Sequence, residues 1–308
     1  MSETAESMNG APGRAHILCK PFKLLVAGLP ARRPGQPGRA CLSNIGHLRA
    51  APAVLRSFVP NPENHPRTAS LSAADVEAIE RNTLTAVSAK PVEAFPVGSA
   101  FADWLLPLDP RPIGRASSAF ALRHVAPPVP GQLIAEVEKI YESHGLPTAF
   151  RLADLPCFSE LQAALKQHGY QRQQQTLVQI RVGTGSIQYP GAFSSGERAQ
   201  IEAAPGADSI RASIRSQENA GDILASGIAA FAHGWCCIHA LQTSTRHRGK
   251  GLATAVMAAL ALATMDRGIE KVFLQVEESN TVARSLYAKA GFTTAWRYEY
   301  WRKPGTPA

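Results

Sequence analysis

The sequence has little of what marks a secreted or membrane protein. Its 308 residues include only five cysteines, and no two of them stand in a C-x-x-C spacing. An odd number of cysteines in a long chain argues against an extracellular disulfide scaffold. No apolar run approaches the ~18 residues that a membrane helix needs. The apolar run at 24–29 is too short for the core of a signal peptide. We therefore expect a cytoplasmic protein that does not engage a membrane.

Charge is also scarce, and it is unevenly distributed. Charged residues make up 18% of the chain and hydrophobic residues 45%, which is enough apolar material for a folded core and excludes wholesale disorder. The formal net charge is +8. Residues 1–70 hold nine Lys and Arg against three Asp and Glu, so this segment carries +6 and the remainder only +2. The basic excess therefore belongs to one terminal segment and not to a folded face.

The segment 1–70 also lacks hydrophobic periodicity. It contains 9 of the 23 prolines and six glycines, which predicts a disordered tail. An Arg-rich, acid-poor tail is compatible with a nucleic-acid-binding arm or a transit peptide. A solvated tail without a specific role is the simpler interpretation, and we favour it.

Periodic segments begin near residue 71, where Ser72 and Asp75 have the spacing of a capping box. Helices are expected over residues 132–144, 158–168, 197–203, 251–267 and 281–290. Strands are expected over residues 148–152, 173–182, 223–230, 235–242, 272–276 and 294–302. Because the helix at 251–267 has no charge before Asp266, we expect it to be buried almost all round. The final strand looks exposed and could pair with a second chain in a homodimer.

A weak internal repeat accompanies this pattern. A helix, a glycine followed by an aromatic residue, and an alternating strand occur around Gly169 and again around Gly291, 122 residues later. The repeat suggests two copies of one α/β fold.

The strongest chemical motif is the basic, glycine-containing run at 246–253. It follows a predicted strand and opens a helix, whose first N–H groups have no intrahelical partner and face anions favourably. Gly249 and Gly251 allow close approach of a phosphate, while Arg246, Arg248 and Lys250 add positive charge. The run fits neither a Walker A loop nor a Rossmann loop. It predicts a diphosphate site.

A second motif lies downstream at the end of a predicted strand. Asn280, Ala283 and Tyr287 fall at i, i+3 and i+7, so they share one stripe of the helix. Val282 and Leu286 lie on another face, which is available for the core. Ligands of open α/β sheets bind at the carboxyl ends of strands, where this stripe starts.

Together the two motifs resemble the GNAT N-acetyltransferase superfamily. Arg246, Gly249 and Gly251 match its R/Q-x-x-G-x-G/A motif, and the run from Asn280 to Phe292 matches its Asn-x-x-Ala-x-x-x-Tyr-x-x-x-Gly-Phe element. The clear resemblance covers residues 222–303. A looser one over residues 71–182 is similar to the degenerate N-terminal half of two-domain GNAT proteins.

The resemblance implies an α/β fold class: tandem GNAT-like folds, each with a mixed central sheet flanked by helices. The expected organisation is a tail at 1–70, a degenerate GNAT-like domain at 71–182 and a catalytic domain at 183–308. Prolines near residues 127–130 remove N–H donors, and the counterparts of Tyr287 and Asn280 at the 122-residue offset are Leu165 and Phe158. The first copy is therefore expected to bind no CoA.

The resemblance also implies a reaction and a site. Acetyl-CoA, or another acyl-CoA, is the implied co-substrate, the acceptor is a small-molecule or peptide amine, and no metal is expected. The pyrophosphate would rest on the amides of the 246–253 run, and the pantetheine arm would pair with a splayed strand end. The residues implied to hold the co-substrate are Leu241, Gln242, Thr243, Arg246, His247, Arg248, Gly249, Lys250, Gly251, Leu252, Ala253, Asn280, Ala283 and Tyr287.

For catalysis, Tyr287 would protonate the departing thiolate as general acid. The general base stays open between Glu277, His239 and water. The adjacent Cys236 and Cys237 are interpreted as small buried hydrophobes. Two other functions remain as alternatives: a non-catalytic acyl-CoA sensor, and a nucleic-acid-binding protein acting through the basic tail.

Overall fold

The computed structural model describes residues 71–183, 199–204, 208–219 and 221–305. These residues fall in one compact unit, Glu63–Ala308. The predicted tail at 1–70 lies outside the described residues.

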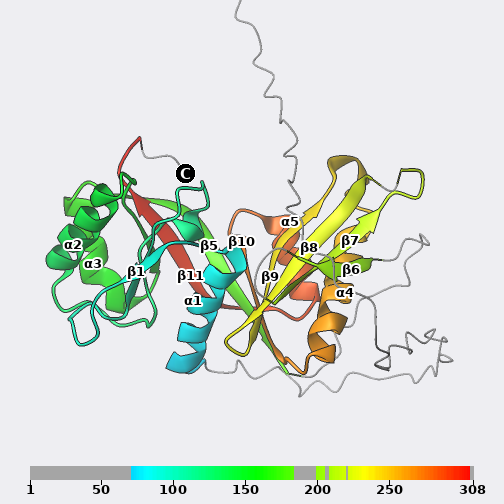
Figure 1. The fold of residues 1–308 in the computed structure, drawn as a ribbon, viewed down its shortest axis with the longest axis horizontal. Coiled ribbons are helices and arrows are strands. Elements are labelled where there is room, and N and C mark those ends of the chain that lie inside the picture. Colours follow the sequence, from blue (N-terminus) through cyan, green and yellow to red (C-terminus); the bar gives the residue numbers. More distant parts are fainter. Residues whose placement is uncertain (1–70, 184–198, 205–207, 220, 306–308) are drawn as a thin grey trace, which may run out of the picture. The chain divides into compact units, whose positions relative to one another are not determined.

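One large mixed sheet organises the described chain (Figure 1). Its strands run in the order β4-β11-β5-β10-β9-β8-β7-β6, and β9 and β10 are its parallel pair. A smaller antiparallel sheet has the order β1-β2-β3, and a parallel bridge between Ala119 and Phe150 links its end to β4. The mixed α/β fold class expected from the sequence is confirmed.

The bounds of the elements are as follows. The helices are α1 (Ala73–Val87), α2 (Pro130–Ser143), α3 (Ser159–Gln167), α4 (Leu252–Asp266) and α5 (Thr281–Lys289). The strands of the small sheet are β1 (Val92–Ala94), β2 (Trp104–Pro107) and β3 (Phe120–Ala121). Those of the large sheet are β4 (Ala149–Ala153), β5 (Gln171–Val182), β6 (Gln200–Ala203), β7 (Ser209–Arg215), β8 (Ile223–Ala232), β9 (Trp235–Thr243), β10 (Lys271–Glu277) and β11 (Thr293–Arg302).

The predicted repeat is present in the order and spacing of these elements. Each element of the second repeat starts 122 residues after its counterpart in the first. The corresponding pairs are α2 and α4, β4 and β10, α3 and α5, and β5 and β11. At the pivots, Gly169 and Gly291 have φ of 82° and 83°, a conformation that residues with a Cβ avoid. Each glycine therefore ends a helix and turns the chain into its long strand.

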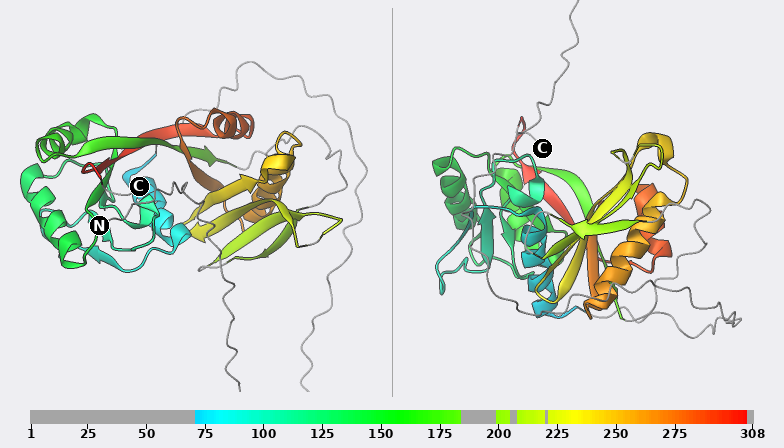
Figure 2. Two further views of the ribbon diagram at one scale, coloured as in Figure 1. Left: turned by 90° about the horizontal axis from the view of Figure 1, so that it is seen from above. Right: turned by 45° about the vertical axis from the view of Figure 1, so that its right-hand side comes forward.

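The two repeats exchange their long strands. The strand β5 of the first repeat lies between β10 and β11 of the second, and β11 lies between β4 and β5 (Figure 2). Tyr298 of β11, for example, is opposite Ala153 on one side and Thr176 on the other. The expectation that the final strand presents a free edge to a second chain is wrong, because both of its edges are already paired.

Helix α1 packs on the β8–β9 hairpin and is fixed by side chains at several points. Its capping box between Ser72 and Asp75 forms as predicted, and Lys271 of β10 donates to Asp75 at 2.7 Å. The Asn82 amide donates to the carbonyl oxygens of Ala232 (2.9 Å) and Trp235 (2.7 Å). These bonds hold one face of the sheet against α1, while α4 covers the other face.

The structure differs from the expectation for two segments that were predicted to be helices, one in its secondary structure and one in its burial. Residues 200–203 form strand β6, paired antiparallel with β7, because a ladder partner outweighs the weak helical pattern of so short a segment. Helix α4 is buried on one side only, since Leu262 is 62% and Met265 47% exposed. On its buried side α4 packs tightly on β8, where a Cβ at Gly227 would lie 3.1 Å from both Leu241 and Val256. The expectation of burial all round α4 is therefore wrong.

Candidate acyl-CoA pocket

A pocket of about 560 Å³ opens between the end of β9, the loop that precedes α4, and α5. It brings the segment at 241–254 together with the segment at 280–287. Its lining residues are Leu241, Gln242, Thr243, His247, Arg248, Gly249, Gly251, Leu252, Ala253, Thr254, Asn280, Val282, Ala283, Leu286 and Tyr287.

The pocket begins where β9 and β10 part. Their parallel pairing runs from Cys236–Val272 to Ile238–Leu274 and then stops, although both strands continue. Just beyond, Ala240 has φ of 51° and the register of β9 against β8 shifts. This bulge turns β9 away from β10, so the backbone of its last residues lacks a ladder partner on that side. The splayed strand end expected at Leu241–Thr243 is present.

The loop before α4 has the geometry of an anion-binding turn. Gly249 and Gly251 both have φ of 78°, and a Cβ at either would meet no atom within 4 Å. The glycines are therefore needed for their backbone conformation, and the space beside them is open. Gly251 is the N-cap of α4, so the following amides lack intrahelical acceptors and the positive end of the helix dipole points at the pocket.

The residues of this loop differ in how they relate to the pocket. The amide of His247 donates to the carbonyl of Ser244 at 2.9 Å, so it is already used in a turn. Arg246 and Lys250 are exposed and do not line the pocket. Arg248 is one of the lining residues. The glycines and the first residues of α4 form the wall at this end, together with His247 and Arg248.

The α5 side of the pocket carries the predicted stripe. Asn280 caps the helix by accepting the amide of Ala283 at 3.1 Å, and both residues line the pocket with Tyr287. The Tyr287 ring packs edge-on against Phe292 with centroids 6.1 Å apart. Burial raises the pKa of Tyr287 above its ordinary value, so its hydroxyl keeps its proton at neutral pH.

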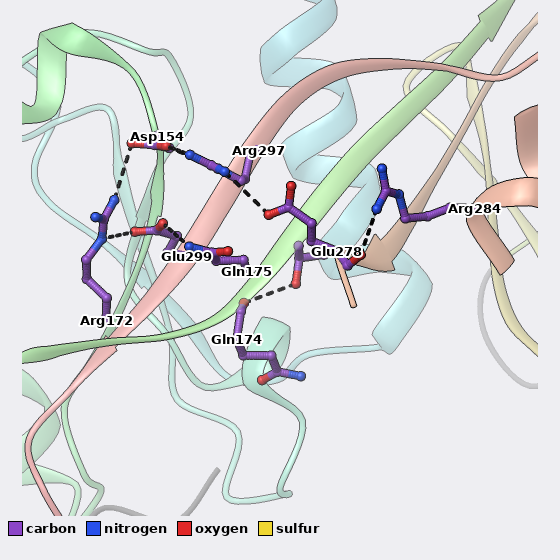
Figure 3. Close-up of polar contacts among 9 residues, drawn as sticks. Asp154, Arg172, Gln174, Gln175, Glu278, Arg284, Arg297 and Glu299 are labelled. Atoms are coloured by element: carbon purple, nitrogen blue, oxygen red, sulfur yellow. Dashed lines mark hydrogen bonds and ion pairs between the residues drawn. The ribbon is translucent and has the colours of Figure 1, made fainter. Parts of the chain in front are cut away.

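The start of α5 is held by a polar network that spans both repeats (Figure 3). Arg297 of β11 binds Asp154, which follows β4, and also reaches Glu278 at 3.4 Å. Glu278 in turn accepts Arg284 of α5 at its carbonyl (2.9 Å), and its amide donates to the carbonyl of Gln175 (2.9 Å). The position of the Asn280 cap is therefore set by β5 and β11 as well as by α5.

The two base candidates lie away from the pocket lining. Glu277 ends β10 with an exposed side chain that accepts Gln174 at 2.9 Å. His239 lies on β9, and its Nε2 is buried without a hydrogen-bond partner in the described structure. Burial, together with the positive charges of Arg115 and Arg211, lowers the pKa of His239 to about 4. This imidazole is neutral at physiological pH and able to accept a proton only weakly.

The adjacent cysteines of β9 are inert. Burial raises the pKa of Cys236 and of Cys237 to about 12, which keeps both thiols protonated. Their interpretation as small buried hydrophobes agrees with this environment.

The sequence interpretation missed three residues of the pocket. Thr254 lies in the first turn of α4, and Val282 and Leu286 lie on the face of α5 that was expected to enter the core. Val282 is 82% exposed, so that expectation is wrong for it. An apolar side chain at the second position of a helix, next to a cap that faces a site, was the signal available.

The matching region of the first repeat is filled. The counterparts of Asn280 and Tyr287, Phe158 and Leu165, are both buried in the core. Phe158 packs edge-on against His124 with ring centroids 6.2 Å apart, and a cavity of only about 10 Å³ remains beside them.

Residues 206–292 match the family model described as the Acetyltransferase (GNAT) family. The C-terminal part of this chain, which carries the pocket, is therefore similar to the GNAT family. A 78-residue stretch is 33% identical to the uncharacterized N-acetyltransferase YobR of Bacillus subtilis (strain 168), covering 25% of this chain and 32% of that relative. The chain thus spans about a third of the length of this curated relative.

Solved structures extend the likeness beyond residues 206–292. A GCN5-related N-acetyltransferase from Kribbella flavida superposes with a TM-score of 0.58 at 16% identity, covering 76% of this chain and 96% of that chain. A tandem GNAT protein from the clavulanic acid biosynthesis pathway superposes with a TM-score of 0.51 at 12% identity, covering 75% and 96%. At such identities the likeness is one of fold, and it includes the first repeat.

Two further features concern the described residues. No helix among them has the length and apolar character to cross a membrane. Within the same residues, no three His, Cys, Asp or Glu side chains gather in a group that could hold a metal ion.

Proposed function

We propose that the protein is an acyl-CoA-dependent N-acyltransferase that transfers an acetyl group from acetyl-CoA to a primary amine. The observation that carries the proposal is one pocket in which three features meet: the free amides of the α4 N-terminus, the splayed end of β9, and Tyr287. An anion site, an unpaired strand edge and an acid are the three parts that a bound thioester of this kind needs.

Each part of the pocket has a proposed role in binding or catalysis. The amides after Arg248 and the N-terminus of α4 would hold the diphosphate, and the backbone near Leu241 and Gln242 would pair with the pantetheine amides. A backbone N–H of β9 would stabilise the oxyanion. When the amine nitrogen attacks the thioester carbonyl, a C–N bond forms and the C–S bond breaks. Tyr287 would give its proton to the departing thiolate, and the ammonium proton would pass to His239, Glu277 or water.

The arrangement of the repeats supports a single CoA site. The second repeat, within the proposed catalytic domain at 183–308, holds the pocket, whereas side chains fill the equivalent region of the proposed degenerate domain at 71–182. An odd number of cysteines, five in 308 residues, agrees with a reducing compartment, and we place the reaction in the cytoplasm.

A matched pair of glycine variants tests the site. Gly249 in the pocket and Gly268 beyond the other end of α4 both have positive φ and no atom within 4 Å of a built Cβ. Gly249→Trp and Gly268→Trp therefore carry similar backbone strain, but only the first fills the pocket. Calorimetric titration of acetyl-CoA should show binding near one site per chain for the wild type and for Gly268→Trp, and none for Gly249→Trp.

Two results would contradict the proposal. If the folded wild-type protein does not bind acetyl-CoA, the transferase function and a sensor function both fail. If it binds acetyl-CoA but acetylates no amine, the protein is a sensor and not an enzyme.

A further inference from the structure

A second polar cluster lies on the sheet face opposite the pocket, at the same parting of β9 and β10. Along β10, Val272, Leu274 and Val276 pack in the core under α4, whereas Phe273 packs in the core that includes α1. Because side chains alternate along a strand, Gln275 shares the α1 face with Phe273. The cluster therefore lies across the sheet from Tyr287.

Gln275 is fixed at the centre of this cluster. Its amide nitrogen donates to Thr83 of α1 at 2.9 Å, and its carbonyl oxygen accepts the Tyr298 hydroxyl of β11 at 2.9 Å. The same oxygen accepts the guanidinium of Arg115 at 3.4 Å. Arg115 belongs to the first repeat, so the cluster joins α1 and both repeats.

Arg115 is held in place but has no counter-ion. It lies in a short 3-10 turn, Gly114–Ala116, whose Gly114 approaches β11 so closely that a Cβ would lie 2.8 Å from the Tyr300 ring. Ser118 braces the turn by donating to the Gly114 carbonyl at 2.6 Å. Across the described residues, Arg115 forms no ion pair, and the long bond to Gln275 is the single hydrogen bond of its side chain. The guanidinium is half-buried and has five N–H donors, so most of them remain open to a ligand or to solvent.

Both charged groups that act on the neighbouring His239, Arg115 and Arg211, are cationic, and the nearby buried carboxylate of Glu80 is paired with Arg151. The charge of Arg115 acts on His239 and Cys237 of β9 and on Tyr298, which places it beside the α1 face of the strand end. A second arginine, Arg211 of β7, also acts on His239, and the carboxylate opposite it in the ladder, Glu202, bonds to Arg215 at 3.8 Å. His239 itself presents a buried, unpartnered Nε2.

We propose that Arg115 binds a carboxylate of the acceptor, so that the substrate is a molecule with both a primary amine and a carboxylate, as in a free amino acid. The inference rests on the proposed transferase function and deepens it. A planar guanidinium pairs with a carboxylate through two parallel N–H···O bonds. One arginine among neutral amides and hydroxyls matches the single charge of a carboxylate better than the double charge of a phosphate monoester. Arg115 is a positioning residue that orients the amine toward the parting of the strands.

Matched pairs of acceptors test this inference. The twenty L-amino acids, β-alanine and γ-aminobutyrate are each compared with the corresponding primary amide, with acetyl-CoA as donor and full-length protein as enzyme. The wild type should turn over at least one amino acid with kcat/KM about 10- to 100-fold above that of its amide, as expected for losing a charge-assisted hydrogen bond at a half-buried site. Arg115→Met should bring this ratio to about one, mainly through KM, and Arg115→Lys should restore part of it.

Two controls separate the possible failures. Arg123→Met removes an exposed arginine paired with Asp103 in the same repeat and should leave the ratio unchanged. The affinity for acetyl-CoA, measured by calorimetry, should change less than about twofold in Arg115→Met, because Arg115 does not line the pocket.

The outcomes are distinct. Equal rates for acids and amides, a preference that survives in Arg115→Met, or binding of acetyl-CoA without turnover of any amino acid would overturn the carboxylate inference and leave acetyl-CoA binding intact. A preference for O-phosphoethanolamine over γ-aminobutyrate would replace the carboxylate by a phosphate and overturn the inference as stated. Failure of the wild type to bind acetyl-CoA would remove the proposed function and the inference together.

Discussion

Ile180 of β5 lies opposite Phe273 of β10 in the antiparallel ladder, and on its other side it faces β11. A strand of the first repeat therefore completes the sheet of the second, and β11 completes the sheet of the first. The exchange makes each repeat a structural part of the other, although the sequence divides them at residue 182.

The first prediction concerns this exchange. A fragment of residues 183–308 should fail to fold, because removing β5 leaves β10 and β11 with unpaired edges in the middle of the sheet. A fragment of residues 71–308 should unfold in one cooperative transition. Circular dichroism and urea titration of the two fragments check this, and a cooperatively folded 183–308 fragment would show that the exchange is dispensable.

The second prediction concerns the buried ion pair between Arg151 of β4 and Glu80 of α1. Their side chains are 1% and 5% exposed and 2.6 Å apart, and the Arg151 guanidinium also lies 4.3 Å from the Phe120 ring centroid. Glu80→Gln should lower the free energy of unfolding by about 3–5 kcal/mol, because it leaves a buried cation uncompensated. The exposed pair Arg81–Glu77 is the control, and Glu77→Gln should cost no more than about 0.5 kcal/mol. Equal losses would contradict the assignment.

The third prediction concerns Tyr287 as general acid. Tyr287→Phe should lower kcat by about 10²- to 10⁴-fold while the affinity for acetyl-CoA changes little. Tyr170→Phe, which removes a hydroxyl bonded to Glu138 outside the pocket, should leave kcat unchanged. Because burial raises the pKa of Tyr287 above 10.0, the acid stays protonated and its loss should not limit the rate below that pH. Unchanged turnover in Tyr287→Phe would remove its catalytic role.

The fourth prediction follows from the pKa of His239, which burial lowers from 6.5 to about 4. The unfolded chain binds this proton more readily than the folded one, so stability is complete above pH 6.5 and falls as the pH drops through this window. The loss is at most about 1.4 kcal/mol per pH unit for one group. His239→Asn should flatten the difference between pH 6.5 and 4 in urea titrations. An unaltered pH profile would show that another group is responsible.

The local features of the fold and of the pocket could be predicted from the sequence. Gly169 and Gly291 revealed the repeat because helix termination and the turn into a strand depend on a positive φ that glycine adopts readily. The stripe of Asn280, Ala283 and Tyr287 followed from helical periodicity alone, and the structure places all three along one pocket. Such features extend over a few residues, so a single sequence displays them.

The sequence did not predict which strands pair with one another in the sheet. The expected helix at 197–203 became strand β6 at its described end, and the final strand became central instead of exposed, because ladder pairing with a distant strand decides both. The strands of the small sheet were not expected either, since segments of two to four residues carry almost no periodicity.

The sequence by itself thus determined the repeat, the glycine turn before α4 and the helical stripe, because each depends on neighbouring residues. Only the tertiary structure decided that β5 and β11 change places, that His239 faces away from the pocket, and that Arg115 lies beside Gln275, 160 residues later in the chain. Those relationships depend on which strands pair in the sheet and on which side chains this pairing brings together. Both are properties of packing between distant segments, and a local pattern does not encode them.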